Sequence, residues 1–173
     1  MHTIRTLTAA DIPAFRQLRL QALQEYPSAF GATVESELAL TAAQLHARLE
    51  GSSHSRLWGA WVQQQLVGSV GLSHQLQAKV GHKAVLYAVY VVPAARGIGL
   101  ARHLLEAAIA HARQQPDLHQ LQLGVTVGNA PALLLYQSLG FVEYGREPAA
   151  LCVDGRYHDE ILMQLELQPP PQG

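Results

Sequence analysis

The chain has 173 residues, which fits one compact domain, since most domains hold about 100 to 200 residues. Hydrophobic residues make up 49% of it and charged residues 14%, so the bulk of the chain is not intrinsically disordered. The 12 Lys and Arg residues against 13 Asp and Glu residues give a formal net charge of −1. This balance provides no broad positive surface for nucleic acid or for an anionic membrane, and any partner must be recognised locally.

Neither disulfide chemistry nor a targeting segment is indicated. Cys152 is the single cysteine, so no internal disulfide can form, and we interpret it as a small buried hydrophobic residue in a protein of a reducing compartment. Residues 1–11 contain no basic stretch followed by an apolar run. No segment reaches the about 18 uninterrupted apolar residues of a membrane span. These observations predict a cytoplasmic protein.

The N-terminal half of the chain predicts helices that alternate with extended segments. Thr8 and Asp11 have the spacing of a capping box, as do Thr41 and Gln44, so a helix is expected after each pair. In chain order, the periodicity predicts a strand over residues 3–7, a helix from 12 to the break at Tyr26-Pro27, a helix over 41–50, a hairpin of 57–62 with 66–72, and a strand over 84–92 that is covered on both faces.

Turn-forming residues mark the ends of the predicted elements in the C-terminal half of the chain. Pro131 suits the first turn of a helix, Gly140 suits its left-handed cap, and Asp154-Gly155 is a hairpin signal. The predicted elements are a helix over 100–113, a strand over 118–127, a helix over 130–139, a strand over 141–144, and a hairpin of 149–153 with 156–167. This order describes one mixed α/β domain over residues 1–167, and the proline-containing tail, residues 168–173, is expected to be disordered.

The segment from Tyr90 to Leu105 is the most informative for chemistry, because a buried strand, a glycine-containing turn and an amphipathic helix follow one another. Gly97 and Gly99 let the backbone approach a ligand closely, and the free N–H groups of the first helical turn point to the same place. Arg96 and Arg102 flank the turn. The pattern therefore indicates an anion site, and phosphate is the expected ligand.

Two common phosphate-binding motifs do not fit this segment. A Rossmann fingerprint needs a third glycine where Arg102 stands, and the acidic residue at a suitable distance, Asp117, precedes the next predicted strand instead of ending it. A Walker P-loop is excluded because the chain contains no Gly-Lys-Ser or Gly-Lys-Thr. The remaining interpretation is that the glycine-containing turn before residue 100 binds a pyrophosphate in a way that follows neither motif, and we call this turn the cradle.

Two motifs carry a family resemblance. Arg96-Gly-Ile-Gly-Leu-Ala101, after the strand end Val91-Val-Pro93, resembles the R-x-x-G-x-A form of the acetyl-CoA motif of the GCN5-related N-acetyltransferase (GNAT) superfamily. Residues 129–141 are similar to the N-x-x-A-x-x-x-Y-x-x-x-G-F block of the same family. The resemblance implies an α/β (α+β) single-domain fold with a mixed central sheet of about six to seven strands. About four helices would flank this sheet, which would be splayed between its fourth and fifth strands.

The resemblance also implies a set of site residues. Acetyl-CoA is the implied acetyl donor, with no metal, and the acceptor is an amine of a small molecule or peptide. Tyr136 is implied as general acid, and the backbone N–H of Val91 could polarise the thioester carbonyl. The implied acetyl-CoA-binding residues are Tyr90, Val91, Val92, Arg96, Gly97, Ile98, Gly99, Leu100, Ala101, Arg102, Asn129, Ala132 and Tyr136.

The resemblance does not identify a general base in this chain. Many relatives place a glutamate on the strand before Pro93, but residues 84–92 contain no carboxylate. Glu35, Glu37 and Asp159 are candidate amine-recognising or relay groups, because their counterpart segments border the acceptor cleft in the family. Two hypotheses remain open: an N-acetyltransferase that works by direct attack in a ternary complex, and a non-catalytic acyl-CoA-binding module. A homodimer is compatible with the family, and no sequence feature decides the oligomeric state.

Overall fold

The structure is a computed structural model that describes residues 1–50 and 55–169. Its strands are β1 (His2–Thr6), β2 (Ser55–Val62), β3 (Gln65–His74), β4 (Lys83–Val91), β5 (Gln120–Thr126), β6 (Val142–Val153) and β7 (Arg156–Glu166). Its α-helices are α1 (Ile12–Glu25), α2 (Val34–Leu38), α3 (Ala42–Leu49), α4 (Leu100–Arg113) and α5 (Ala130–Ser138). None of these helices is long and apolar enough to cross a membrane.

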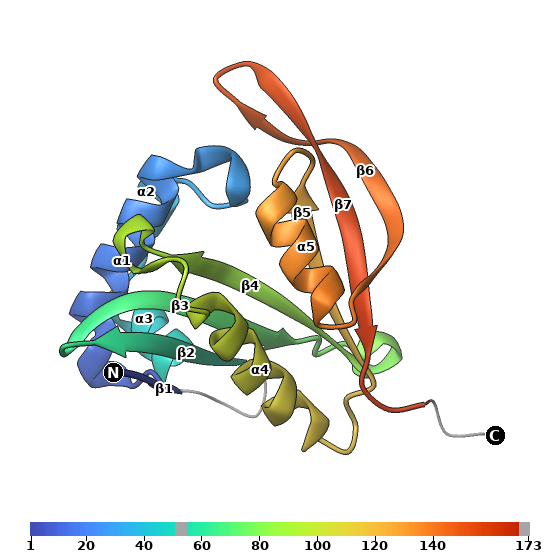
Figure 1. Cartoon of the computed structure of the whole chain (residues 1–173), viewed down its shortest axis with the longest axis horizontal. Coiled ribbons are helices and arrows are strands. Elements are labelled where there is room, and N and C mark those ends of the chain that lie inside the picture. Colours follow the sequence, from blue (N-terminus) through green and yellow to red (C-terminus); the bar gives the residue numbers. More distant parts are fainter. Residues whose placement is uncertain (51–54, 170–173) are drawn as a thin grey trace.

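The strands form one mixed sheet in the order β1-β2-β3-β4-β5-β7-β6, which confirms the predicted fold class. All neighbouring strands are antiparallel except β4 and β5, which run parallel. This parallel pair is short, since it extends only from Lys83 opposite Gln120 to Val85 opposite Gln122. Beyond these residues the two strands separate, as Figure 1 shows, so the predicted splay between the fourth and fifth strands is confirmed.

A β-bulge in β4 accompanies the splay. Ser69 pairs with Tyr90 and Gly71 pairs with Tyr87, so Ala88 and Val89 together oppose one residue of β3. Ala88 has a φ of +52°, which is rare for a residue other than glycine, and its carbonyl oxygen accepts a hydrogen bond from Ser69 Oγ at 2.7 Å. Because a bulge bends its strand, β4 turns where it leaves β5. The bulge lies at residues 88–89, just before residues 90–92.

Helices cover both faces of the antiparallel half of the sheet. α4 packs on one face against β2 and β3, and its buried residues Leu104 and Leu105 join the main core. α1 and α3 contribute Phe15 and Leu49 to a second core that includes Leu57. Successive side chains of a strand point to opposite faces, so β4 packs against both layers. Its side chains alternate between half-buried and buried as far as Tyr90, so the predicted cover on both faces is only partly present.

Local signals placed most helix ends correctly. Thr41 and Gln44 form the predicted capping box, since the backbone N–H of Thr41 donates to Gln44 Oε1 at 2.8 Å and Gln44 N–H donates to Thr41 Oγ1 at 3.2 Å. Gly140 adopts the predicted left-handed conformation after α5, with a φ of +98°. At the β6–β7 turn Asp154 and Gly155 have φ values of +50° and +76°, as the hairpin signal required.

Three local expectations differ from the structure. α2 is a fifth helix that was not predicted, because its five residues are too few to show a period. Residues 142–153 form one strand instead of two, and β6 keeps its pairing with β7 through two register shifts. Cys152 is exposed on β6, so the expectation that it is buried is wrong. Of the predicted tail, residues 170–173 lie outside the described residues.

The N-terminal cap offers a test of the fold's electrostatics. Arg5 donates to both carboxylate oxygens of Asp11, at 2.8 and 2.9 Å, and these hydrogen bonds lower the pKa of Asp11 to about 2. A depressed pKa contributes stability that is complete above the unfolded-state pKa of about 3.9 and is lost as the pH falls through about 2.

We predict that Asp11→Asn lowers the free energy of unfolding by about 1 kcal/mol at pH 6, because Arg5 is half exposed and solvent screens the pair. The difference between the two proteins shrinks between about pH 4 and pH 2. Urea unfolding at several pH values measures it. Asp117→Asn, at an exposed aspartate, is the matched control and leaves stability unchanged. A pH-independent difference for Asp11→Asn would contradict the assignment.

Candidate active site

The predicted anion site is a cavity of about 250 Å³ at the start of α4. Gly97 and Gly99 have φ values of +84° and +82°, which residues with a Cβ rarely adopt, and they let the chain turn into the helix. The first paired amide of the helix is that of His103, which donates to the carbonyl oxygen of Gly99 at 3.0 Å. The preceding N–H groups therefore remain free to bind an anion, with the positive end of the helix dipole behind them.

Arg102 stands beside this cavity and links two helices. Its guanidinium donates to Ser138 Oγ on α5 at 2.5 Å and lies 3.6 Å from the carboxylate of Glu106, one turn further along α4. These contacts fix the guanidinium at the rim of the cavity that it lines. A cation held there adds to the positive field of the helix start.

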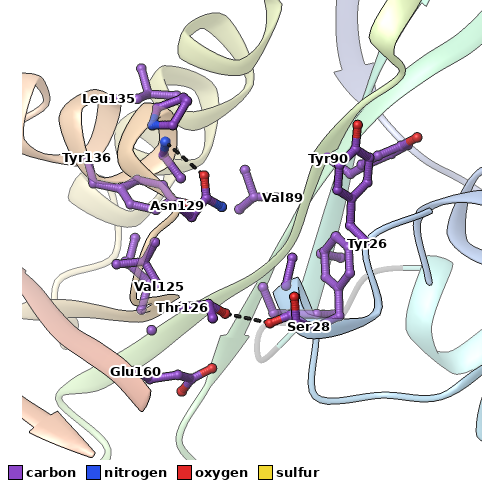
Figure 2. Close-up of a pocket in the computed structure, with 18 of the residues that line it drawn as sticks. Tyr26, Ser28, Val89, Tyr90, Val125, Thr126, Asn129, Leu135, Tyr136 and Glu160 are labelled. Atoms are coloured by element: carbon purple, nitrogen blue, oxygen red, sulfur yellow. Dashed lines mark hydrogen bonds between the residues drawn. The ribbon is translucent and has the colours of Figure 1, made fainter. Parts of the chain in front are cut away.

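A larger cleft of about 830 Å³ opens where β4 and β5 separate (Figure 2). One wall comes from β4 and from the residues that follow α1. The other wall comes from β5, α5 and the start of β7. Four residues line both the cleft and the smaller cavity, so the two spaces are continuous: Val91, Arg96, Ala101 and Leu135.

Tyr136 projects from α5 into this cleft (Figure 2). Its side chain is buried, with 6% of its surface exposed, and its ring packs edge-on against Phe141 at a centroid distance of 6.0 Å. Burial raises the pKa of Tyr136 to about 12. The phenol is therefore protonated at neutral pH and has a proton to donate. Asn129 fixes the start of α5, since its Oδ1 accepts from Ala132 N–H at 3.4 Å.

The facing wall is built from aromatic residues braced by one arginine. Arg96 Nε donates to the carbonyl oxygen of Val91 at 2.9 Å, its Nη1 donates to the Tyr26 hydroxyl at 3.1 Å, and its Cζ lies 5.0 Å from the centre of the Tyr26 ring. The Tyr90 hydroxyl donates to Glu25 Oε2 at 2.8 Å. Burial, followed by this hydrogen bond, raises the pKa of Tyr90 well above its usual value.

One hydrogen bond joins the two walls. Thr126 Oγ1 on β5 donates to the carbonyl oxygen of Ser28 at 2.6 Å, across the mouth of the cleft (Figure 2). Ser28 belongs to the short turn Pro27–Ala29 that follows α1. The N-terminal and C-terminal parts of the chain therefore meet again on the far side of the splay, and this contact fixes the width of the opening.

Glu160 also lines the cleft, from the start of β7 (Figure 2). Its side chain is half-buried, and one of its carboxylate oxygens lies 2.8 Å from the point where a Cβ on Gly124 would stand. Burial, and then the nearby charge of Glu147, raise the pKa of Glu160. The glycine on β5 thus provides the space that the carboxylate occupies.

Comparison with known proteins identifies the family. Residues 17–141 match the acetyltransferase (GNAT) family. The chain belongs to this family. The matched region starts within α1 and ends at Phe141, so it contains the glycine turn before α4, the splayed strands and Tyr136.

The chain is similar to acetyltransferases that are named for different substrates. It is 32% identical over 96 residues to spermidine N(1)-acetyltransferase of Vibrio cholerae, covering 56% of each chain. It is 40% identical over 85 residues to L-methionine sulfoximine/L-methionine sulfone acetyltransferase of Pseudomonas paraeruginosa, covering 49% of each chain. The chain thus spans about half the length of the curated relatives it matches.

The similarity in fold extends over nearly the whole chain. The solved structure of yncA from Salmonella typhimurium, a candidate acetyltransferase with its cofactor acetyl-CoA, superposes with a TM-score of 0.84. The match covers 99% of this chain and 96% of that one, at 24% sequence identity. At this identity the match establishes the common GNAT fold.

The GNAT fold brings most of the residues predicted for acetyl-CoA together. Two of them do not line either cavity. The backbone N–H of Val92 donates to the carbonyl oxygen of Val67 at 2.8 Å, within the sheet, and the Ile98 side chain is 57% exposed on the outer side of the turn. The others line the cradle, the cleft or both: Tyr90, Val91, Arg96, Gly97, Gly99, Leu100, Ala101, Arg102, Asn129, Ala132 and Tyr136.

The carboxylates suggested for the acceptor side have other partners or positions. Glu37 is buried between Arg19 and Arg48, Glu35 is exposed, and Asp159 accepts from Arg146 at 2.9 Å and from Ala149 N–H at 2.8 Å. None of the three lines the cleft, whereas Glu160, next to Asp159, does. Sequence analysis missed Glu160 because neighbouring residues of a strand face opposite sides, and only the register decides which one faces the site.

The buried cluster of Glu37, Arg19 and Arg48 predicts a structural role for Glu37, in place of the acceptor-side role that the sequence suggested. Glu37 is 4% exposed and accepts from Arg19 Nε at 3.1 Å and from Arg48 Nη1 at 3.2 Å. Removing one partner of a buried ion pair leaves an uncompensated charge, which costs about 3 to 5 kcal/mol. We expect Glu37→Gln to lower the free energy of unfolding in urea by about this amount.

Glu35→Gln, at an exposed position of the same helix, is the matched control and changes stability by less than about 0.5 kcal/mol. Equal stability of the two variants would show that the Glu37 cluster is not a structural ion pair.

Proposed function

We propose that the chain is an acetyl-CoA-dependent N-acetyltransferase that transfers the acetyl group to a primary amine of a small molecule or polypeptide. The observation that carries this proposal is the continuity of the anion cradle at the start of α4 with the cleft that contains Tyr136. A phosphate-bearing donor anchored at the cradle has a path to the splay between β4 and β5. The family relationship supports acetyl-CoA as that donor.

In this proposal the pyrophosphate of acetyl-CoA binds the backbone N–H groups of residues 97–101, with Arg102 beside it. The N–H of Arg96, which the sequence also suggested, instead donates to the carbonyl oxygen of Pro93 at 3.2 Å. The pantetheine arm follows the free edge of β4. The register supports this path, since Tyr90 pairs with Ser69 and the N–H of Val92 is bonded to Val67, which turns the N–H of Val91 away from β3. Asn129, Ala132 and Tyr136 border the thioester on the α5 side.

The reaction requires a neutral amine, a polarised carbonyl and a proton for the departing thiolate. The amine nitrogen attacks the thioester carbon, and the carbonyl oxygen accepts a hydrogen bond from the N–H of Val91. The C–S bond then breaks, and Tyr136 protonates the sulfur. A phenol held neutral by burial suits this role, because it has a proton to give only when negative charge develops beside it.

The acceptor is proposed only as a primary amine. The two named relatives act on a polyamine and on amino-acid derivatives, and each covers only about half of the chain. A panel of primary amines with a thiol-release assay, including spermidine and L-methionine sulfone, therefore identifies the acceptor.

Calorimetric titration with acetyl-CoA tests the cradle. We expect binding by the native protein and at least about a tenfold loss of affinity in Gly99→Glu, because a side chain at a φ of +82° strains the turn and its carboxylate repels the pyrophosphate. Gly155→Glu is the matched control: Gly155 also has a positive φ, +76°, but lies at the tip of the β6–β7 hairpin. Absence of binding by the native protein would overturn the proposal.

Tyr136→Phe tests the general acid and separates an enzyme from a non-catalytic acyl-CoA-binding module. We expect turnover to fall by about 100-fold, the lower range of general-acid contributions, while acetyl-CoA affinity is retained. Tyr157→Phe, at a tyrosine that is 72% exposed, is the matched control and keeps full turnover. A native protein that binds acetyl-CoA but releases no thiol with any amine would favour the binding module, and unchanged turnover in Tyr136→Phe would refute the general-acid role.

A further inference from the structure

The cleft contains one carboxylate that could fill the gap left by β4. Residues 83–91, which form β4, include no Asp or Glu. Among the described residues that line the cleft, Glu160 is the only one with a carboxylate side chain. Within residues 1–50 and 55–169 its carboxylate forms no hydrogen bond or ion pair, and its pKa responds only to burial and to the charge of Glu147.

Register places this carboxylate at the point where the sheet opens. Glu160 pairs with Thr126 across β5 and β7, and its side chain extends along β5 over Gly124. The last residue of β5 that pairs with β4 is Gln122, so Gly124 lies just beyond the separation of the two strands. The missing Cβ of Gly124 lets a side chain from the neighbouring strand reach the splay.

Glu160 and Tyr136 approach the splay from opposite faces of β5. Leu123 and Val125 belong to the same core cluster as Tyr136, so Gly124 and Thr126, which alternate with them, face the other side. That side is the one where Thr126 meets Ser28, and Figure 2 shows Glu160 beyond Thr126, away from Tyr136. A donor anchored at α4 arrives on the Tyr136 face, which leaves the Glu160 face for the acceptor.

We propose that Glu160 is the catalytic base that takes a proton from the acceptor ammonium. This inference rests on the proposed function. The acceptor enters as a cation, R–NH₃⁺, and pairs with the Glu160 carboxylate. One N–H bond breaks as the proton moves to the carboxylate, and the freed lone pair attacks the thioester carbon. After the C–S bond breaks, the thiolate takes the Tyr136 proton, the nitrogen's second proton restores the phenol, and Glu160 releases its own proton to solvent.

The charges around Glu160 favour a cationic substrate. Glu147 lies directly opposite it on β6, and like charges paired across strands repel each other, so an ammonium would relieve the repulsion. The cleft's cations are engaged elsewhere: Arg19 pairs with Glu37, and Arg96 donates to the carbonyl oxygen of Val91 and to Tyr26.

The other polar groups that line the cleft near Glu160 leave its carboxylate free. His158 lies on the same face of β7, two residues before Glu160, and Thr126 on β5 donates to Ser28. The hydroxyl of Tyr90 donates to Glu25, and Arg146 on β6 pairs with Asp159 on the opposite face of β7. No cation or hydrogen-bond donor of the described residues therefore occupies the Glu160 carboxylate, which leaves it to pair with the substrate.

The test compares the native protein with Glu160→Gln, using the amine of the acceptor panel that turns over fastest. We expect kcat/KM at pH 7 to fall by about 100-fold, with unchanged calorimetric affinity for acetyl-CoA. The native profile has a plateau between the acid limb set by Glu160 and the pKa of the amine, because the charged carboxylate and the ammonium are both present there. The variant depends on the rare free amine, so its kcat/KM rises about tenfold per pH unit.

Glu147→Gln is the second test, because a purely structural role of Glu160 would not change the pH dependence of kcat/KM in this variant. Removing the like charge lowers the pKa of Glu160, so the acid limb of the kcat/KM profile moves to lower pH, and the plateau falls far less than the about 100-fold expected for Glu160→Gln. Normal turnover with an unchanged pH profile in Glu160→Gln would overturn this inference and leave the proposed function intact. A native protein that neither binds acetyl-CoA nor releases thiol with any amine would overturn both.

Discussion

The site depends on an interruption in the backbone hydrogen bonding of the sheet. β4 and β5 share only the pairs from Lys83–Gln120 to Val85–Gln122, although both strands continue. Backbone N–H and C=O groups that face a cleft without a strand partner must be satisfied in another way. Arg96 satisfies the carbonyl of Val91, and Thr126 bridges to Ser28 by its side chain, while the N–H of Val91 points away from β3. The opening is therefore a place where the fold lacks a strand and a ligand can supply the hydrogen bonds.

Packing at the closed end of the splay keeps this interruption stable. Leu86 of β4, Leu121 of β5 and Met163 of β7 belong to one buried cluster with Leu104 of α4. The strands on both sides of the opening are thus anchored in the same core, and well-packed cores deform little. Because α4 belongs to that core through Leu104, the amide groups at its start are held at a fixed position relative to the splay. One set of apolar contacts therefore places both the cavity at the start of α4 and the cleft, which the proposed function assigns to one ligand.

Sequence patterns predicted the parts of this arrangement that arise from local physics. Capping at Thr41 and Gln44, the glycine turn before α4 and the hairpin turn at Asp154 are decided by residues within a few positions of each other. The apolar run of β4 indicated its place inside the sheet, and the two family motifs implied a mixed sheet that is splayed between its fourth and fifth strands. These features locate the cradle and Tyr136 correctly at the splay.

The acceptor side could not be predicted, because it is assembled by contacts between distant segments. Tyr26 reaches the cleft through a turn that follows α1, and its position is set by Arg96, seventy positions later in the chain. Whether Asp159 or Glu160 faces the cleft depends on the register of β7 against β5, which no local signal encodes. The same alternation along β5 places Val125 on the face of Tyr136 and Gly124 on the face of Glu160, so a single strand separates the phenol from the carboxylate. In the proposed function, a donor and an acceptor that approach from opposite faces of the sheet meet at its opening, which is the arrangement that direct transfer between them requires.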